Sequence, residues 1–218
     1  LIVEARLALR GFVARMAATL RFARSTIALR KQSRIGTRGQ PVLLVYGHPQ
    51  STAAGSDAYF GDMMFRLPGL LRVLHVDCSI SRARSLTGGR TTLSLHAWGS
   101  LADAIRLVFA RWKPTRRWRK SPEYWLVRRA ASLEGGTATG AAIRWQQRCQ
   151  QRWLSEAQPR LVIWPWENHA WGRDLVKSCR AKGIDTVGYQ HSVVGRQMLN
   201  YMSTSNADGL NSIPNTVV

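Results

Sequence analysis

Residues 160–192 read RLVIWPWENHAWGRDLVKSCRAKGIDTVGYQHS, a pattern that predicts a strand, a helix and a second strand. Residues 161–164 form a short apolar run that stops at Pro165, and residues 186–189 form another after a Lys-Gly-Ile-Asp turn signal. Gly183 lies where the intervening helix would end. Apolar residues recur at helical spacing between the runs: Trp171, Leu175, Val176 and Cys179. This succession predicts two parallel strands joined by a right-handed crossover.

Polar residues follow both predicted strands. Glu167 and Asn168 come after the first strand, and Gln190, His191 and Ser192 come after the second. Parallel strands bring their carboxyl ends to one edge of the sheet, and open α/β sheets bind ligands along that edge. A carboxylate and an imidazole facing one crevice can supply a general base and a proton carrier, so Glu167 and His191 are the candidate catalytic residues.

Simpler interpretations of both residues stay open. Glu167 can serve as an acid at a helix N-terminus, where the helix dipole favours negative charge. His191 can simply end a strand.

A further apolar run, residues 42–46, opens at Pro41 and ends at Gly-His-Pro, so His48 also stands after a predicted strand. A doubly wound sheet that places this strand beside the one at 161–164 would bring His48 to Glu167 and His191. Lone histidines are more often structural, so both interpretations of His48 remain. We predict an α/β fold with a Rossmann-like, mostly parallel sheet and flanking helices over residues 35–200.

Residues 1–34 are apolar and arginine-rich, and they predict one helix preceding that domain. On a helical wheel one apolar stripe stands out, made of Ile2, Leu9, Val13, Met16, Leu20 and Ile27. Two interpretations stay open. The stripe can lie on an anionic membrane as part of a basic amphipathic helix, or it can pack on its own domain.

The 218 residues carry a formal net charge of +20, which points to a polyanionic partner such as nucleic acid, anionic lipid or a phosphorylated substrate. Residues 112–129 are the densest basic and aromatic segment. Such a segment can stack on bases, lie at a membrane interface, or form a solvated surface that its tryptophans anchor to the core.

The remaining sequence signals mostly show which structures and catalytic motifs are absent from the sequence. Three scattered cysteines favour a reducing cytoplasmic setting. No apolar run reaches the roughly 18 residues that span a bilayer. Walker, Gly-x-Ser-x-Gly, Cys-x-x-Cys and His-Glu-x-x-His motifs do not occur, and no cluster of metal ligands is evident. We therefore expect neither a bound metal nor a bound cofactor.

Several short motifs carry a resemblance to a known family. They are Trp-Glu-Asn at 166–168, Arg173 in the following helix, Gly-Tyr-Gln-His at 188–191, and Ser-Ile-Pro-Asn-Thr-Val-Val at 212–218. Together they resemble the N-terminal half of GT-B glycosyltransferases that build bacterial capsule and lipopolysaccharide, including Kdo-transferase-like enzymes. The resemblance covers mainly residues 160–218, and more loosely the run from Pro41.

In that family two Rossmann-like domains face each other, the N-terminal one mostly holding the acceptor and the other the nucleotide sugar. The resemblance implies acid/base chemistry for Glu167 and a place in the cleft for His191. We expect substrate contacts from five further polar residues near these two: His48, Asn168, Arg173, Gln190 and Ser192. Residues 201–218 would then be a linker towards a C-terminal domain beyond this chain, and the enzymes usually act without a bound metal.

The expected function is therefore transfer of a sugar from a nucleotide sugar to a glycan or lipid-linked acceptor. The expected location is cytoplasmic and peripheral on the inner membrane, held there by the basic helix. Two alternatives from other classes remain: a nucleic-acid-binding module using residues 112–129, and a membrane-surface scaffold without catalysis using residues 1–34.

Overall fold

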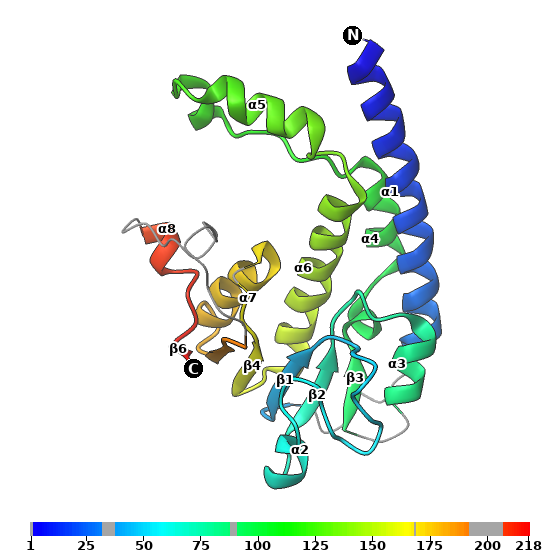
Figure 1. The fold of residues 1–218 in the computed structure, drawn as a ribbon, viewed down its shortest axis with the longest axis vertical. Helices are drawn as coiled ribbons and strands as arrows, with labels where there is room; N and C mark the ends of the chain where they lie inside the picture. Colours follow the sequence, from blue (N-terminus) through cyan, green and yellow to red (C-terminus); the bar gives the residue numbers. More distant parts are fainter. Residues whose placement is uncertain (1, 32–37, 88–90, 168, 192–206) are drawn as a thin grey trace.

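A computed structural model of the chain shows one parallel sheet with helices packed on both faces (Figure 1). The structure describes residues 2–31, 38–87, 91–167, 169–191 and 207–218. The strands are β1 (Pro41–Val45), β2 (Leu71–Leu74), β3 (Thr92–Ser94), β4 (Leu161–Pro165), β5 (Asp185–Tyr189) and β6 (Thr216–Val217).

The α-helices are α1 (Ile2–Leu29), α2 (Met63–Arg66), α3 (Ile80–Leu86), α4 (Leu101–Arg106), α5 (Tyr124–Leu133), α6 (Ala138–Ala157), α7 (Ala170–Arg180) and α8 (Ala207–Leu210). Three short 3₁₀ helices complete the described elements: η1 (Leu95–Trp98), η2 (Leu107–Phe109) and η3 (Arg116–Lys120).

The six-stranded sheet has the order β3-β2-β1-β4-β5-β6, and every pairing is parallel. The prediction of a Rossmann-like α/β fold is confirmed, because this is the doubly wound order in which the chain returns to the centre after β3. β1 lies beside β4, with Leu43 opposite Ile163. The carboxyl ends of β1, β4 and β5 therefore sit next to one another.

Alternate residues of the central strands face two different cores. Val42 and Leu44 of β1 pack in the cluster that contains α6 and α7, whereas Leu43 and Val45 pack in the cluster that contains α3. Such alternation is the expected consequence of the two-residue period of a strand. Four tryptophans are almost completely buried: Trp98, Trp145, Trp153 and Trp164.

The C-terminal segment differs from the linker predicted at 201–218. Its described part adds α8 and then β6, which pairs with β5 so that Gly188 lies opposite Val217. The Asn215 side chain accepts hydrogen bonds from the amide and hydroxyl of Thr186. A Cβ at Gly188 would come within 2.9 Å of both Trp166 and Pro214, so glycine allows this close approach. A strand of two residues is too short to show a period in the sequence.

His96 of η1 is held in the core in one neutral tautomer. The Trp145 indole Nε1–H donates to His96 Nδ1 at 3.1 Å, and His96 Nε2 lies 2.9 Å from the Val76 carbonyl oxygen. An indole N–H can only donate, so Nδ1 accepts and Nε2 carries the proton. Burial lowers the pKa of His96 to about 4, because the charged imidazolium loses its hydration there.

We expect the protein to lose stability as the pH falls from about 6.5 to about 4. The unfolded histidine, with an ordinary pKa of about 6.5, binds a proton in this window while folded His96 does not. The accumulated loss near pH 4 is on the order of 3 kcal/mol. The measurement is urea unfolding at several pH values, compared with a His96→Gln variant that keeps a donor and an acceptor but does not titrate. Equal pH slopes for both proteins would show that His96 is not responsible.

Candidate active site at the carboxyl edge of the sheet

A carboxylate held between two imidazoles lies where β4 and β5 end. Glu167 Oε1 is 3.2 Å from His191 Nε2, and Glu167 Oε2 is 2.7 Å from His169 Nε2. The Glu167 and His191 side chains are 31% and 24% exposed. Both are thus partly shielded from water but accessible to a ligand. The two predicted catalytic residues are brought together, and His169 joins them.

The strand register explains this placement. Pro165 of β4 lies opposite Tyr189 of β5. Glu167 and His191 each follow two residues later, so they lie level with each other. β4 ends at Pro165, and α7 does not begin until Ala170. The intervening turn places His169 at the N-cap of α7. Asn168 itself lies outside the described residues.

His48 reaches this group through an aromatic side chain that sequence reasoning missed. The Tyr59 ring lies edge-on to His191 with centroids 5.1 Å apart, and edge-on to His48 at 6.0 Å. Burial raises the pKa of Tyr59, and the negative charge of Glu167 raises it further, so the phenol keeps its proton. No motif or period in the sequence marked Tyr59, because its contacts with His48 and His191 depend on how the loop folds against the sheet.

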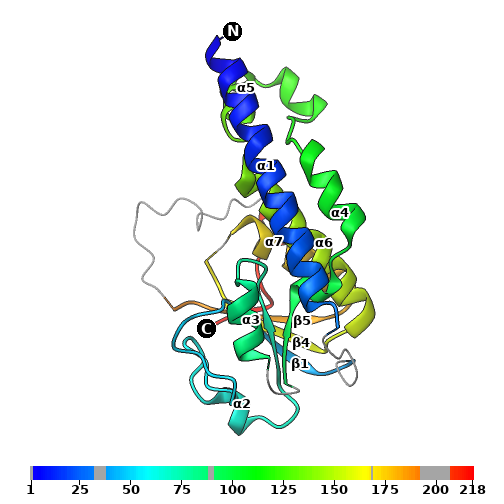
Figure 2. The same cartoon turned by 90° about the vertical axis from the view of Figure 1, so that its right-hand side faces the viewer.

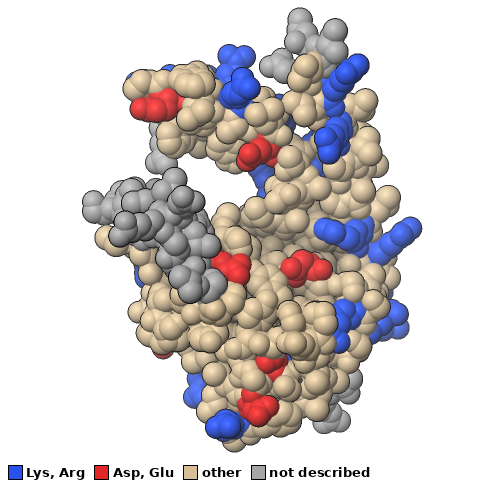
Figure 3. Space-filling view, in the orientation of Figure 1, with Lys and Arg blue, Asp and Glu red and all other residues tan. Residues whose placement is uncertain are grey.

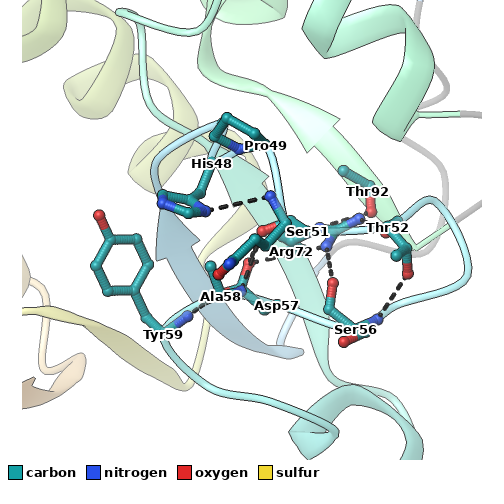
Figure 4. Close-up of polar contacts among 12 residues, drawn as sticks. His48, Pro49, Ser51, Thr52, Ser56, Asp57, Ala58, Tyr59, Arg72 and Thr92 are labelled. Atoms are coloured by element: carbon teal, nitrogen blue, oxygen red, sulfur yellow. Dashed lines mark hydrogen bonds and ion pairs between the residues drawn. The ribbon is translucent and has the colours of Figure 1, made fainter.

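The loop that carries His48 and Tyr59 is fastened by Arg72, a completely buried arginine of β2 (Figure 4). Its guanidinium donates to the carbonyl oxygens of Thr52 at 2.6 Å and Ser56 at 3.1 Å. It also forms an ion pair with buried Asp57, at 3.8 Å. The carboxylate of Asp57 in turn accepts hydrogen bonds from the Ser51 hydroxyl and the Tyr59 amide.

A second arginine holds the first half of the same loop. Arg82 of α3 donates to the carbonyl oxygens of His48, Pro49 and Ser51, the last at 2.6 Å. The loop between β1 and α2 is therefore tied to the sheet and to α3 at once. This double attachment fixes one wall of the site although the loop has little regular secondary structure.

A polar pair borders the site on the side of β2. His75 Nδ1 lies 2.8 Å from Asp77 Oδ1. The centroid of the His75 ring lies 4.8 Å from that of Trp171 and 5.0 Å from that of Tyr46. Burial opposes ionisation of Asp77, but the hydrogen bond and charge of His75, together with a backbone hydrogen bond, outweigh burial and hold the pKa of Asp77 below its usual range. Burial, reinforced by Glu167, raises the pKa of Tyr46 well above its ordinary value. An open hollow of about 510 Å³ adjoins this pair and is lined partly by Tyr46, His48, Asp77 and Arg82.

The other predicted substrate contacts have different surroundings. Arg173 Nε donates to the Ser212 hydroxyl at 3.0 Å, which joins α7 to the C-terminal segment. The backbone N–H of Gln190 donates to the Val218 carbonyl oxygen at 2.7 Å. Ser192, like Asn168, lies outside the described residues. The described contact of Arg173 is structural, and it is the family resemblance that suggested a substrate contact.

Two properties of the described part of the chain bear on function. It contains no group of three or more His, Cys, Asp or Glu side chains that could hold a metal ion. Among the described residues, no helix combines the length and apolar character needed to cross a membrane.

Comparison with known proteins leaves the site to be interpreted on its chemistry. No protein-family model, no curated protein and no solved structure matches the chain.

Proposed function

We propose that this chain forms the acceptor side of a glycosyltransferase that moves a sugar from a nucleotide-activated donor to a hydroxyl group of a growing surface glycan. The observation that carries the proposal is the Glu167 carboxylate between His169 and His191 at the ligand-binding edge of a Rossmann-like sheet. The motifs at 166–168 and 188–191 that resemble GT-B enzymes include Glu167 and His191. Fold and motif therefore point to the same edge.

In the proposed reaction Glu167 acts as the general base. It takes the proton of the acceptor hydroxyl as that oxygen attacks the anomeric carbon of the donor sugar. The bond from this carbon to the nucleotide phosphate breaks, and the phosphate leaves with the bonding electrons. The imidazoles of His169 and His191 orient the carboxylate, and either one can pass the proton on to water.

The surroundings of the site suit a sugar acceptor. Tyr59 and His48 offer ring faces and polar edges next to His191, and sugars bind well to surfaces that combine these features. We place the reaction at the cytoplasmic face of the inner membrane, with the protein bound peripherally. The expected partners are a nucleotide sugar and a glycan or lipid-linked acceptor.

The direct test is a transfer assay on the intact protein with a panel of radiolabelled nucleotide sugars and glycan acceptors. We expect labelled acceptor with at least one donor. A His191→Gln variant is expected to turn over about 100-fold more slowly, the usual effect of losing an acid/base group. His169→Gln should act in the same direction, because both rings hold Glu167.

Glu156→Gln is the matched control, because Glu156 lies on the exposed side of α6. Wild-type turnover in both histidine variants would remove the pair from the mechanism. Transfer of label to no acceptor, with every donor in the panel, would contradict the proposed reaction itself.

A further inference from the structure

The N-terminal helix α1 faces its own domain with residues that lie off its apolar stripe. Phe22 and Leu29 are almost completely buried, and Phe22 stacks on Trp145 with ring centroids 5.2 Å apart. Arg15 is also buried; its Nε donates to the Val108 carbonyl oxygen at 2.8 Å, and Nη1 donates to that of Gly136. These contacts fix which side of α1 points outward.

The outward side carries the apolar stripe. Its members are between 40% and 65% exposed: Leu9, Val13, Met16, Leu20 and Ile27. Packing of the stripe on its own domain, one of the two interpretations left open by the sequence, is therefore excluded for these residues. Phe22 and Leu29, two large apolar residues that lie off the stripe, face the core instead.

A second apolar row lies next to α1. Leu101, Ile105 and Phe109 recur every four residues along α4 and η2 and are between 45% and 80% exposed. Figure 2 shows α4 running alongside α1 on the side of the molecule that faces the viewer. Exposed large apolar side chains gathered on neighbouring elements usually mark an interaction site.

Positive charge accompanies this surface. Exposed arginines lie along one side of the stripe on the helical wheel, with Arg6 and Arg24 next to it and Arg10 and Arg21 further round. Figure 3 shows Lys and Arg along the edge formed by α1. Among the described side chains of α1 and α4, the one carboxylate is that of Asp103. It is buried and forms an ion pair with Arg152, so it does not offset the positive charge of this surface.

The N-terminal half of α1 borders a cavity of about 380 Å³ whose lining includes arginines and several hydroxyl groups. The basic and hydroxyl-bearing residues are Arg10, Arg15, Arg111, Ser132, Thr137 and Thr139. Burial lowers the pKa of Arg15, and the nearby charge of Arg111 lowers it further.

We propose that the outer face of α1 binds the surface of an anionic lipid bilayer, with the stripe in the acyl boundary and the arginines at the headgroup phosphates. Lipid satisfies both features of this face, since amphipathic helices gain from apolar burial and from attraction to anionic headgroups. A second copy of the chain would bring two arginine rows together. Nucleic acid would neutralise the arginines but would leave the aliphatic stripe without a partner.

The test is co-sedimentation of the intact protein with vesicles of phosphatidylcholine alone or mixed with phosphatidylglycerol. We expect clearly stronger binding to the anionic vesicles. The double variant Val13→Gln/Leu20→Gln should weaken that binding at least about tenfold, because each apolar side chain loses its burial. The double variant Arg10→Gln/Arg24→Gln should weaken it about 30-fold, since each basic residue near the surface adds about 1 kcal/mol.

Phe65→Gln and Arg66→Gln are matched controls, because both residues are exposed on the distant helix α2. Equal binding to neutral and anionic vesicles, or unchanged binding in both double variants, would overturn the proposal. So would a dimer in analytical ultracentrifugation that only the Val13/Leu20 variant dissociates, or tight binding to an oligonucleotide with no binding to vesicles.

The inference does not depend on the proposed transfer reaction. The substitutions on α1 lie outside the candidate active site, so turnover with a water-soluble acceptor is expected to stay unchanged while vesicle binding falls. Failure of glycosyl transfer would leave the vesicle result standing, and failure of vesicle binding would leave the transfer result standing.

Discussion

Replacing Glu167 by Gln is expected to lower kcat for glycosyl transfer by at least about 100-fold, the usual minimum for loss of a general base. The substitution keeps the size of the side chain and one hydrogen-bonding oxygen for His169 or His191. It removes the negative charge and the ability to accept a proton. KM should change little, because the acceptor is held mainly by the walls of the site.

The informative measurement is kcat and KM side by side, together with the thermal unfolding midpoint. An unchanged midpoint shows that the loss is chemical and not structural. Glu156→Gln serves again as the control for a charge change elsewhere on the surface. If Glu167→Gln retained wild-type kcat, the carboxylate would be no more than the acid at the start of α7 that the sequence also allowed.

Replacing Arg72 by Leu is expected to lower the free energy of unfolding by about 3–5 kcal/mol, because one partner of a buried ion pair is left without the other. Arg72 and Asp57 have no exposed side-chain surface. The variant also leaves the carbonyl oxygens of Thr52 and Ser56 without their donor. Urea unfolding measured against Arg84→Leu, an exposed arginine of α3, isolates the effect of burial.

The double variant Arg72→Leu/Asp57→Ala provides the sharper comparison. It should be less destabilised than the sum of the two single variants, because neither charge is then buried alone. A loss below about 1 kcal/mol for Arg72→Leu would contradict the account, since that is the scale of an exposed ion pair. The loop that carries His48 and Tyr59 should loosen in the same variant, which would appear as a higher KM for the acceptor.

The α/β fold could be predicted from the sequence because its signals are local. Pro41 and Pro165 bound runs of apolar residues, and the residues between the strands recur at helical spacing. The pairing of β1 with β4 was one arrangement that the doubly wound order allowed, and the structure shows it. Glu167 and His191 could be chosen for the same reason, since each comes directly after a buried strand.

Other features depend on contacts between distant segments. Tyr59 joins His48 to His191 because buried Arg72 and Asp57, together with Arg82, hold an irregular loop in place. β6 pairs with β5 where Gly188 leaves room for Pro214. No period or motif records such contacts, since each one joins residues far apart in the chain.

The helix α1 shows most clearly which features follow from the sequence and which depend on the tertiary structure. Its apolar stripe and its arginines are visible in the sequence as a period of 3.6 residues, and this pattern establishes that the helix is amphipathic. The pattern is the same whether the stripe faces a core or a membrane. The choice depends on which side of the helix meets complementary surface, and Phe22 and Leu29, packed into the core, turn the stripe outward. Local periodicity follows from the chain alone, whereas the direction a face points requires the packing of the whole molecule.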